Sequence, residues 1–101
     1  LYKYFFTDVW NIKEIYSYEV PSSTAWAGAS YGRHFEPTLY VGIEAFWKQK
    51  EAALNAYHEE MRAFPHARSI DAVRALAQYR GSQVGLAKAE AFVVERLVQV
   101  R

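Results

Sequence analysis

A polar joint at residues 80–85, with the sequence RGSQVG, separates two stretches of different character near the C-terminus. Before it, apolar residues over 70–80 recur at helical spacing. The tail after it fits a helical or an extended period, and we favour an extended segment at about 89–94. Gly81 is suited to a helix C-cap in the left-handed conformation, and Gly85 to the start of a turn. The alternative is that the two glycines let the backbone approach a neighbouring loop closely. The chain is therefore expected to pass from a helix into an extended segment here.

Two helices are predicted upstream of this joint. Ser69 is a good N-cap for the helix at about 70–80, and Asp71 lies in its first turn, where the helix dipole favours a carboxylate. A longer helix is predicted at about 44–62, ending before Pro65 because proline disfavours helical geometry in the preceding residue. Its expected buried face consists of the apolar residues Phe46, Ala53, Leu54, Tyr57 and Met61.

The N-terminal half has the patterns of strands. The segment at about 15–20 alternates in polarity and is followed by Pro21, and the segment at about 38–43 is β-branched and aromatic. The aromatic stretch at 2–10 also favours a short strand. Residues 21–32 read as a long Ser-, Thr-, Gly- and Ala-rich loop, and loops of this length inside compact domains tend to be functional or mobile.

Composition limits the class of protein. With 101 residues, 51% hydrophobic and 17% aromatic, we expect one α/β domain over residues 1–101 and not a disordered chain. A formal net charge of +1 gives no electrostatic case for a nucleic-acid partner. The absence of cysteine excludes disulfides, thiolate chemistry and cysteine-based zinc sites. No apolar run approaches the roughly 20 residues of a membrane span, so a cytoplasmic protein is expected.

The histidines do not form a metal-binding pattern. His34, His58 and His66 are not spaced as a helical i, i+4 pair, and no HExxH motif is present. His66 lies in FPHARS, between the two predicted helices, where a fixed imidazole is able to donate to an oxyanion or a substrate hydroxyl. The alternative is a structural histidine that helps to cap the second helix.

Glu90 is the carboxylate with the clearest need of a partner. It stands between two alanines in an apolar stretch, where a charge requires a partner or an exposed position. Arg68 and Arg80 are the candidate partners. A structural ion pair and a role in a site are both open for Glu90. No phosphate-binding loop and no nucleophile elbow occur in the sequence.

Five segments in order resemble one family. They are YEVPSSTAW, FEPTLYVGI, the pattern K-x-x-A-L-x-A-Y, FPHARSIDAVRALAQYRGSQVG and AEAF. Their order and spacing resemble the C-terminal part of the LmbE-like, or PIG-L, zinc-dependent N-acetylglucosaminyl deacetylases, over about residues 16–92. Residues 1–15 lie outside the resemblance, and the chain begins with Leu1, which suggests a processed chain or a piece of a longer one.

The resemblance implies a Rossmann-like fold and hydrolysis of the N-acetyl amide of an N-acetylglucosamine-type substrate. Family members hold zinc with an N-terminal His-Pro-Asp-Asp motif and a later histidine, and the zinc activates water for attack on the amide. This sequence has no His-Pro-Asp-Asp motif. No zinc ligand is carried over, so the segment is expected to bind no zinc and to be inactive alone, with zinc in the full-length protein.

The resemblance also suggests roles for particular residues. His66 is the tentative catalytic donor. Arg68, Arg80, Gln83 and Glu90 are tentative substrate-binding residues at the rim of the pocket, where Arg80 and Gln83 would bond sugar hydroxyls or hold Glu90. The alternative function is a non-catalytic carbohydrate-binding or interaction module derived from the same fold. Half of a doubly covered sheet would expose an apolar face, so self-association into a homo-oligomer is expected.

Overall fold

The structure is a computed structural model that describes residues 11–20, 34–57 and 59–101. The elements are β1 (Glu14–Tyr18), β2 (Leu39–Gly42), a 3₁₀ turn η3 (Glu44–Phe46), α3 (Trp47–Ala56), α4 (Ile70–Ser82) and β3 (Ala89–Leu97). They form a small mixed α/β unit, which confirms the predicted class. The strand predicted at 2–10, the loop predicted at 21–32 and His58 lie outside the described residues.

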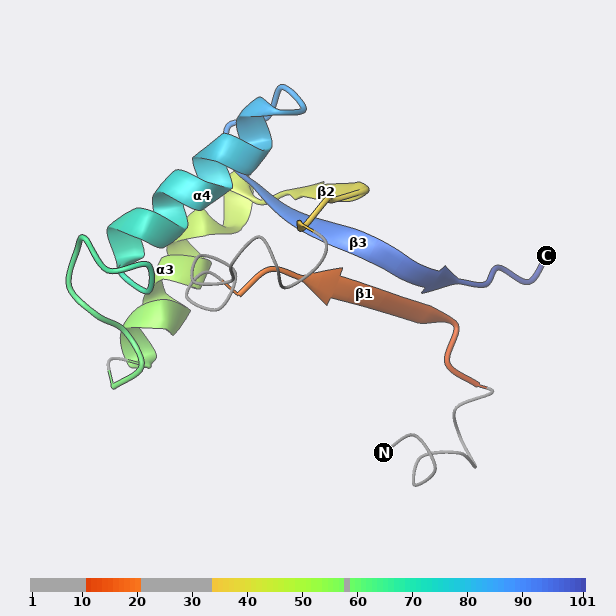
Figure 1. The fold of residues 1–101 in the computed structure, drawn as a ribbon, viewed down its shortest axis with the longest axis horizontal. Helices are drawn as coiled ribbons and strands as arrows, with labels where there is room; N and C mark the ends of the chain where they lie inside the picture. The colour runs from red at the N-terminus through yellow and green to blue at the C-terminus, as the bar shows by residue number, and fades with distance from the viewer. Residues whose placement is uncertain (1–10, 21–33, 58) are drawn as a thin grey trace.

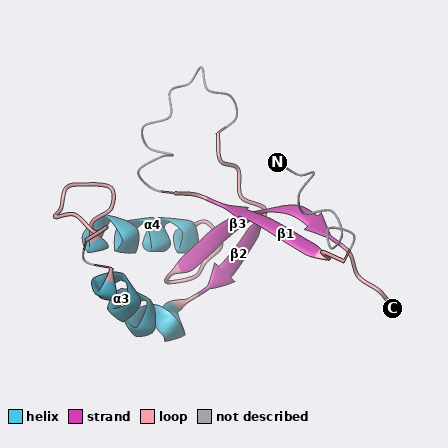
Figure 2. Cartoon of the chain, turned by 90° about the horizontal axis from the view of Figure 1, so that it is seen from below, coloured by secondary structure: helices cyan, strands magenta, loops and turns pink. Residues whose placement is uncertain are grey.

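The three strands form an antiparallel sheet in the order β1-β3-β2 (Figure 1). The long central strand β3 pairs with β2 over its first part, Ala89 to Phe92, and with β1 from Phe92 to Leu97. Phe92 alone has a partner on both sides, Leu39 and Tyr18. The two helices gather at one end of this staggered sheet, while β1 and the distal part of β3 extend away from them (Figures 1 and 2).

The predicted strands are confirmed with small shifts of their ends. The strand predicted at 15–20 ends at Tyr18, and the one predicted at 38–43 is Leu39–Gly42. The extended segment predicted at 89–94 continues to Leu97, because β1 pairs with this part of β3 across an irregularity between Ile15 and Tyr16. A bulge of this kind adds a residue and increases the twist of the ribbon.

The helix predicted at 44–62 is wrong in its length. It begins with the turn η3, continues as α3, and ends at Ala56. Two carboxylates, Glu59 and Glu60, follow this end, where the helix dipole disfavours negative charge. The guanidinium of Arg62 donates to the Glu59 and Met61 carbonyl oxygens, which gives this segment hydrogen bonds outside a helix.

The predicted buried face of this helix is also wrong. Phe46 is 64% exposed and Tyr57 is exposed, whereas Trp47, next to Phe46, is only 7% exposed. Trp47 packs in a small core with Ile43 and Ala77, against which Val73 is partly buried. A short helix that packs through one residue at its start does not need the long apolar stripe that periodicity suggested.

The helix predicted at 70–80 is confirmed as α4. The Ser69 hydroxyl accepts a hydrogen bond from the Ala72 N–H at 3.1 Å, as expected of an N-cap. The predicted C-cap role of Gly81 is wrong, since Gly81 is buried inside the helix, which runs to Ser82. Among the residues that the structure describes, Gly85 has a positive φ, of 75°.

Gly81 is required for close packing instead. A Cβ atom at this position would lie 2.4 Å from the Leu86 carbonyl oxygen and 3.0 Å from the Lys88 Cα atom. The Leu86 N–H donates to the Gly81 carbonyl oxygen at 2.8 Å, so the turn folds back directly onto the helix. The chain between α4 and β3 therefore runs in close contact with the last turn of the helix, and β3 begins directly after this contact.

The two faces of the sheet differ in exposure. On one face, Ala89 and Ala91 are buried, and on the same side the Tyr40 hydroxyl donates to the side-chain Oε1 atom of Gln83, which follows α4. On the other face lie Tyr16, Tyr18, Leu39, Val41, Phe92 and Val94, as the strand register requires. Within the described residues Tyr18 is 69% exposed there, in agreement with the predicted apolar face. No helix among the described residues is long and apolar enough to cross a membrane.

Candidate functional site

A cavity of about 410 Å³ lies beside β3 at the point where β1 ends. Because β1 pairs with β3 only from Phe92 onward, the first residues of β3 have β2 on one side and the cavity on the other. The helices α3 and α4 supply the remaining walls. The lining residues are Tyr18, Glu19, Lys50, Leu54, Val73, Leu76, Ala77, Arg80, Ala89, Glu90, Ala91 and Phe92.

The edge of β3 presents backbone groups toward this cavity. The Ile43 N–H donates to the Lys88 carbonyl oxygen, so Lys88 and, by alternation, Glu90 direct their backbone groups toward β2. The N–H and C=O groups of Ala89 therefore point to the opposite side, where the cavity lies, whereas those of Ala91 face the end of β1. Backbone donors and acceptors of this kind orient ligands in pockets that are otherwise apolar.

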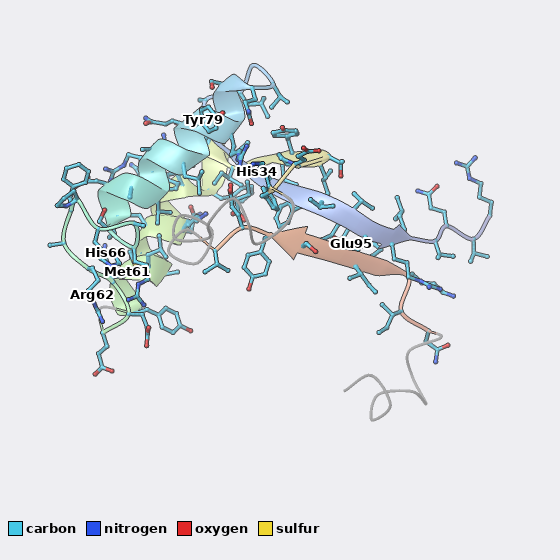
Figure 3. All side chains as sticks on the ribbon, viewed as in Figure 1. His34, Met61, Arg62, His66, Tyr79 and Glu95 are labelled. Atoms are coloured by element: carbon cyan, nitrogen blue, oxygen red, sulfur yellow. The ribbon has the colours of Figure 1, made fainter. Side chains whose placement is uncertain are left out.

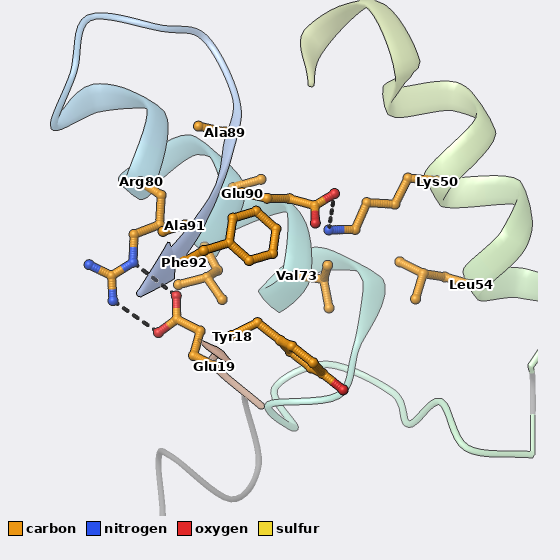
Figure 4. A pocket seen from close by; sticks show the side chains of 12 residues that line it. Tyr18, Glu19, Lys50, Leu54, Val73, Arg80, Ala89, Glu90, Ala91 and Phe92 are labelled. Atoms are coloured by element: carbon orange, nitrogen blue, oxygen red, sulfur yellow. Dashed lines mark hydrogen bonds and ion pairs between the residues drawn. The ribbon is translucent and has the colours of Figure 1, made fainter. Parts of the chain in front are cut away.

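The first of two ion pairs in the wall joins α4 to the end of β1. The Arg80 Nε atom donates to Glu19 Oε1 at 2.9 Å, and its Nη2 atom donates to Oε2 at 2.9 Å (Figure 4). The two side chains are 12% and 11% exposed. The hydrogen bonds that Arg80 donates to the Glu19 carboxylate raise the pKa of Arg80, against the opposing effect of burial, so Arg80 is cationic throughout the physiological range.

The second ion pair joins α3 to β3 and corrects the expected partner of Glu90. Neither Arg68 nor Arg80 holds Glu90; its Oε1 atom lies 3.5 Å from the Lys50 Nζ atom. Both side chains are partly exposed, so this pair contributes little to stability. In Figure 4 the Phe92 ring lies between the two ion pairs.

The structure brings some of the predicted site residues together and separates others. Arg80 and Glu90 line the cavity, and the Gln83 side chain accepts from the third guanidinium nitrogen of Arg80 at 3.1 Å. Arg68 does not line the cavity and lies 3.6 Å from Glu60. His66 does not line it either.

His66 lies at the N-terminal end of α4, near Met61 and Arg62 (Figure 3). Its Nδ1 atom accepts a hydrogen bond from the Arg68 N–H at 3.0 Å, and its carbonyl oxygen accepts from the Ser69 N–H at 2.9 Å. These contacts stabilise the turn that leads into the helix. They support the structural alternative, in which the histidine helps to position the helix cap.

Replacing His66 by alanine is therefore expected to lower the free energy of unfolding by about 1 kcal/mol, because one turn hydrogen bond is lost. Turnover on an N-acetylglucosamine substrate should stay nearly unchanged. Both quantities are to be measured in the complete protein, by denaturant unfolding and by acetate release. A loss of about 10²–10³-fold in turnover with unchanged stability would instead assign His66 as the donor to the tetrahedral intermediate.

Sequence reasoning missed two charged residues of the wall, Glu19 and Lys50. Glu19 lies at the end of an alternating segment, and a carboxylate in that position reads as an exposed strand end. Lys50 reads as part of the polar face of a helix. Only their ion pairs with residues far apart in the sequence identify them as wall residues, and a single sequence carries no signal for that pairing.

In the described ranges, no group of three or more His, Cys, Asp or Glu residues is placed so as to hold a metal ion. The cavity therefore offers apolar contact, backbone hydrogen bonds and two ion pairs, with no metal ligand set of its own. Comparisons with protein-family models, with curated proteins and with solved structures found no match for this chain.

Proposed function

We propose that this chain is the C-terminal segment of a zinc-dependent deacetylase that hydrolyses the N-acetyl amide of an N-acetylglucosamine-type substrate. In this proposal the cavity beside β3 forms part of the substrate side of the active site. The zinc and its ligands belong to an upstream part of the complete protein, because the His-Pro-Asp-Asp motif of the resembled family is missing from this sequence. The described residues contain no group that fits a metal ion.

The proposal rests on which segments of the sequence supply the residues that line the cavity. Every lining residue comes from four of the five segments that resemble the deacetylases. YEVPSSTAW provides Tyr18 and Glu19, and K-x-x-A-L-x-A-Y provides Lys50 and Leu54. The long helix segment provides four residues of α4, and AEAF provides the start of β3. Residues as far apart in the sequence as Tyr18 and Phe92 thus meet around one space.

The chemistry of the wall suits a substrate-positioning role. The apolar lining favours the carbon faces of a sugar or its aglycone, and the backbone groups of Ala89 can pair with hydroxyl or amide groups. Lys50 and Glu90 are partly exposed and weakly paired, so either is accessible to a polar substituent. Zinc, when bound upstream, would supply an activated water for amide hydrolysis.

The Rossmann-like part of the proposal concerns the upstream half of the protein. The strands described are all antiparallel, whereas doubly wound folds are built mainly from parallel strands. We therefore propose that β1, β2 and β3 form an antiparallel extension and that parallel strands come from the upstream segment.

The alternative is a non-catalytic binding or interaction module, and the exposed sheet face favours it. Tyr16, Tyr18 and Val41 are exposed on that face among the described residues. If the face pairs with a second copy, the chain will form a homo-oligomer; in the deacetylase proposal, the upstream part of the same protein covers it. Sedimentation of the complete protein separates the two, since only the module proposal requires a dimer.

The coding sequence upstream of Leu1 tests the proposal. We expect it to encode a His-Pro-Asp-Asp motif in the same reading frame. A start codon directly before Leu1 would refute the deacetylase proposal and leave the module.

A further inference from the structure

Arg80 uses all of its guanidinium nitrogens within the protein. Two of them hold the two oxygens of Glu19 at 2.9 Å each, and the third donates to Gln83 at 3.1 Å. A bidentate guanidinium–carboxylate pair is among the strongest and most directional hydrogen-bonded contacts in proteins. These three bonds involve three of the five N–H donors of the guanidinium and fix its orientation, so its contacts indicate a structural role.

The same guanidinium also contacts aromatic rings. Its central carbon lies 5.5 Å from the centroid of the Phe35 ring and 5.3 Å from that of Tyr79. A planar cation over an aromatic face is favourable, more so where water is partly excluded. Tyr79 belongs to α4 itself, whereas Phe35 belongs to the chain that leads into β2.

The positions of Glu19 and Phe35 give these contacts their significance. Glu19 directly follows β1, and Phe35 precedes β2 by a few residues. In the sheet the two strands do not pair with each other, because β3 lies between them. The Arg80 side chain is therefore a link between the chain end leaving β1 and the chain entering β2, and it joins both to α4.

We propose that Arg80 is a positioning residue: it fixes the end of β1 and the start of the β2 segment against α4, and thereby sets the wall of the cavity. Glu19 and Arg80 both line that cavity, and within the described residues their pair joins the end of β1 to α4, whereas the ladder joins β1 to β3. This inference does not depend on the deacetylase proposal.

Arg80→Lys tests the proposal in the complete protein, because lysine keeps the charge but not the bidentate geometry or the flat stacking surface. Arg74→Lys is the matched control. Arg74 lies on the same helix, contacts Asp71 and Glu51 at 2.9 Å each and stacks on Trp47, but it is 33% exposed and joins only the two helices. Glu19→Gln removes the other partner and serves as the second variant if Arg80→Lys does not fold.

Hydrogen exchange measured by mass spectrometry on peptides from β1 and α4 gives the readout. Arg80→Lys and Glu19→Gln should each speed exchange in the β1 peptide by about tenfold or more through local opening, with less than a twofold change in α4. Arg74→Lys should leave the β1 peptide within twofold of the wild type. Equal acceleration of β1 and α4, or no acceleration of β1 in either variant, would overturn the positioning role.

Discussion

Trp47→Ala is expected to lower the free energy of unfolding by about 3–5 kcal/mol, the usual cost of removing a large aromatic side chain from a core. Trp47 is 7% exposed and is the largest side chain in a core that otherwise contains Ile43 and Ala77, with Val73 against it. Lys50, Arg74 and Lys88 also place their charged groups within 6 Å of its ring, at 5.9, 5.8 and 5.6 Å. Nothing of similar size can replace these contacts.

Phe46→Ala is the matched control, because Phe46 is the neighbouring aromatic residue and is 64% exposed. Its replacement should change stability by no more than about 0.5 kcal/mol. Urea unfolding of both variants in the complete protein, followed by circular dichroism, provides the measurement. Equal losses for the two variants, or a larger loss for Phe46→Ala, would show that the core is not organised around Trp47.

Gly81→Ala is expected to destabilise the fold by about 3 kcal/mol, at the upper end of the usual range for overpacking. At an ordinary position inside a helix the same change stabilises by about 1 kcal/mol. Here the added Cβ would lie 2.4 Å from the Leu86 carbonyl oxygen, which is a backbone atom and cannot rotate away. The turn would have to move, and β3 begins directly after it.

Gly85→Ala separates packing from backbone conformation. Gly85 has a φ of 75° and no atom within 4 Å of a built Cβ, so alanine there should cost only the left-handed strain of about 1–2 kcal/mol. Thermal or urea unfolding should therefore rank Gly81→Ala below Gly85→Ala in stability. A neutral or stabilising Gly81→Ala variant would contradict the close approach of the turn to α4.

Element types were predictable where local chemistry determines them. Ser69 and Asp71 mark the start of α4 because a hydroxyl cap and a carboxylate in the first turn satisfy the helix N-terminus locally. Alternation at 15–20 and the β-branched run at 38–43 identify β1 and β2, because these patterns too are properties of the local sequence.

Burial and pairing were not predictable, because they depend on distant parts of the chain. Periodicity favours Phe46 and Tyr57 as core residues, but a helix of only 10 residues packs through Trp47 at its start. A glycine after a helical pattern reads as a cap; only the position of Leu86 shows why Gly81 has no side chain. Likewise, Arg68 and Arg80 are the partners that the sequence suggests for Glu90, but its partner in the structure is Lys50 of α3.

Acetate release by the purified complete protein tests the central claim that the cavity serves a zinc-dependent deacetylase. The assay uses an N-acetylglucosamine-bearing substrate, with zinc present, removed by a chelator and then restored. Leu54→Trp places a larger side chain in the cavity. Ala53→Trp is the control, because it adds the same side chain at the adjacent, exposed position of α3.

We expect acetate release that is lost with the chelator and recovered with zinc, together with a KM raised by about tenfold or more, or 1.4 kcal/mol, in Leu54→Trp only. No zinc-dependent acetate release would contradict the proposed activity. Release with an unchanged KM in Leu54→Trp would show that the substrate binds away from this cavity.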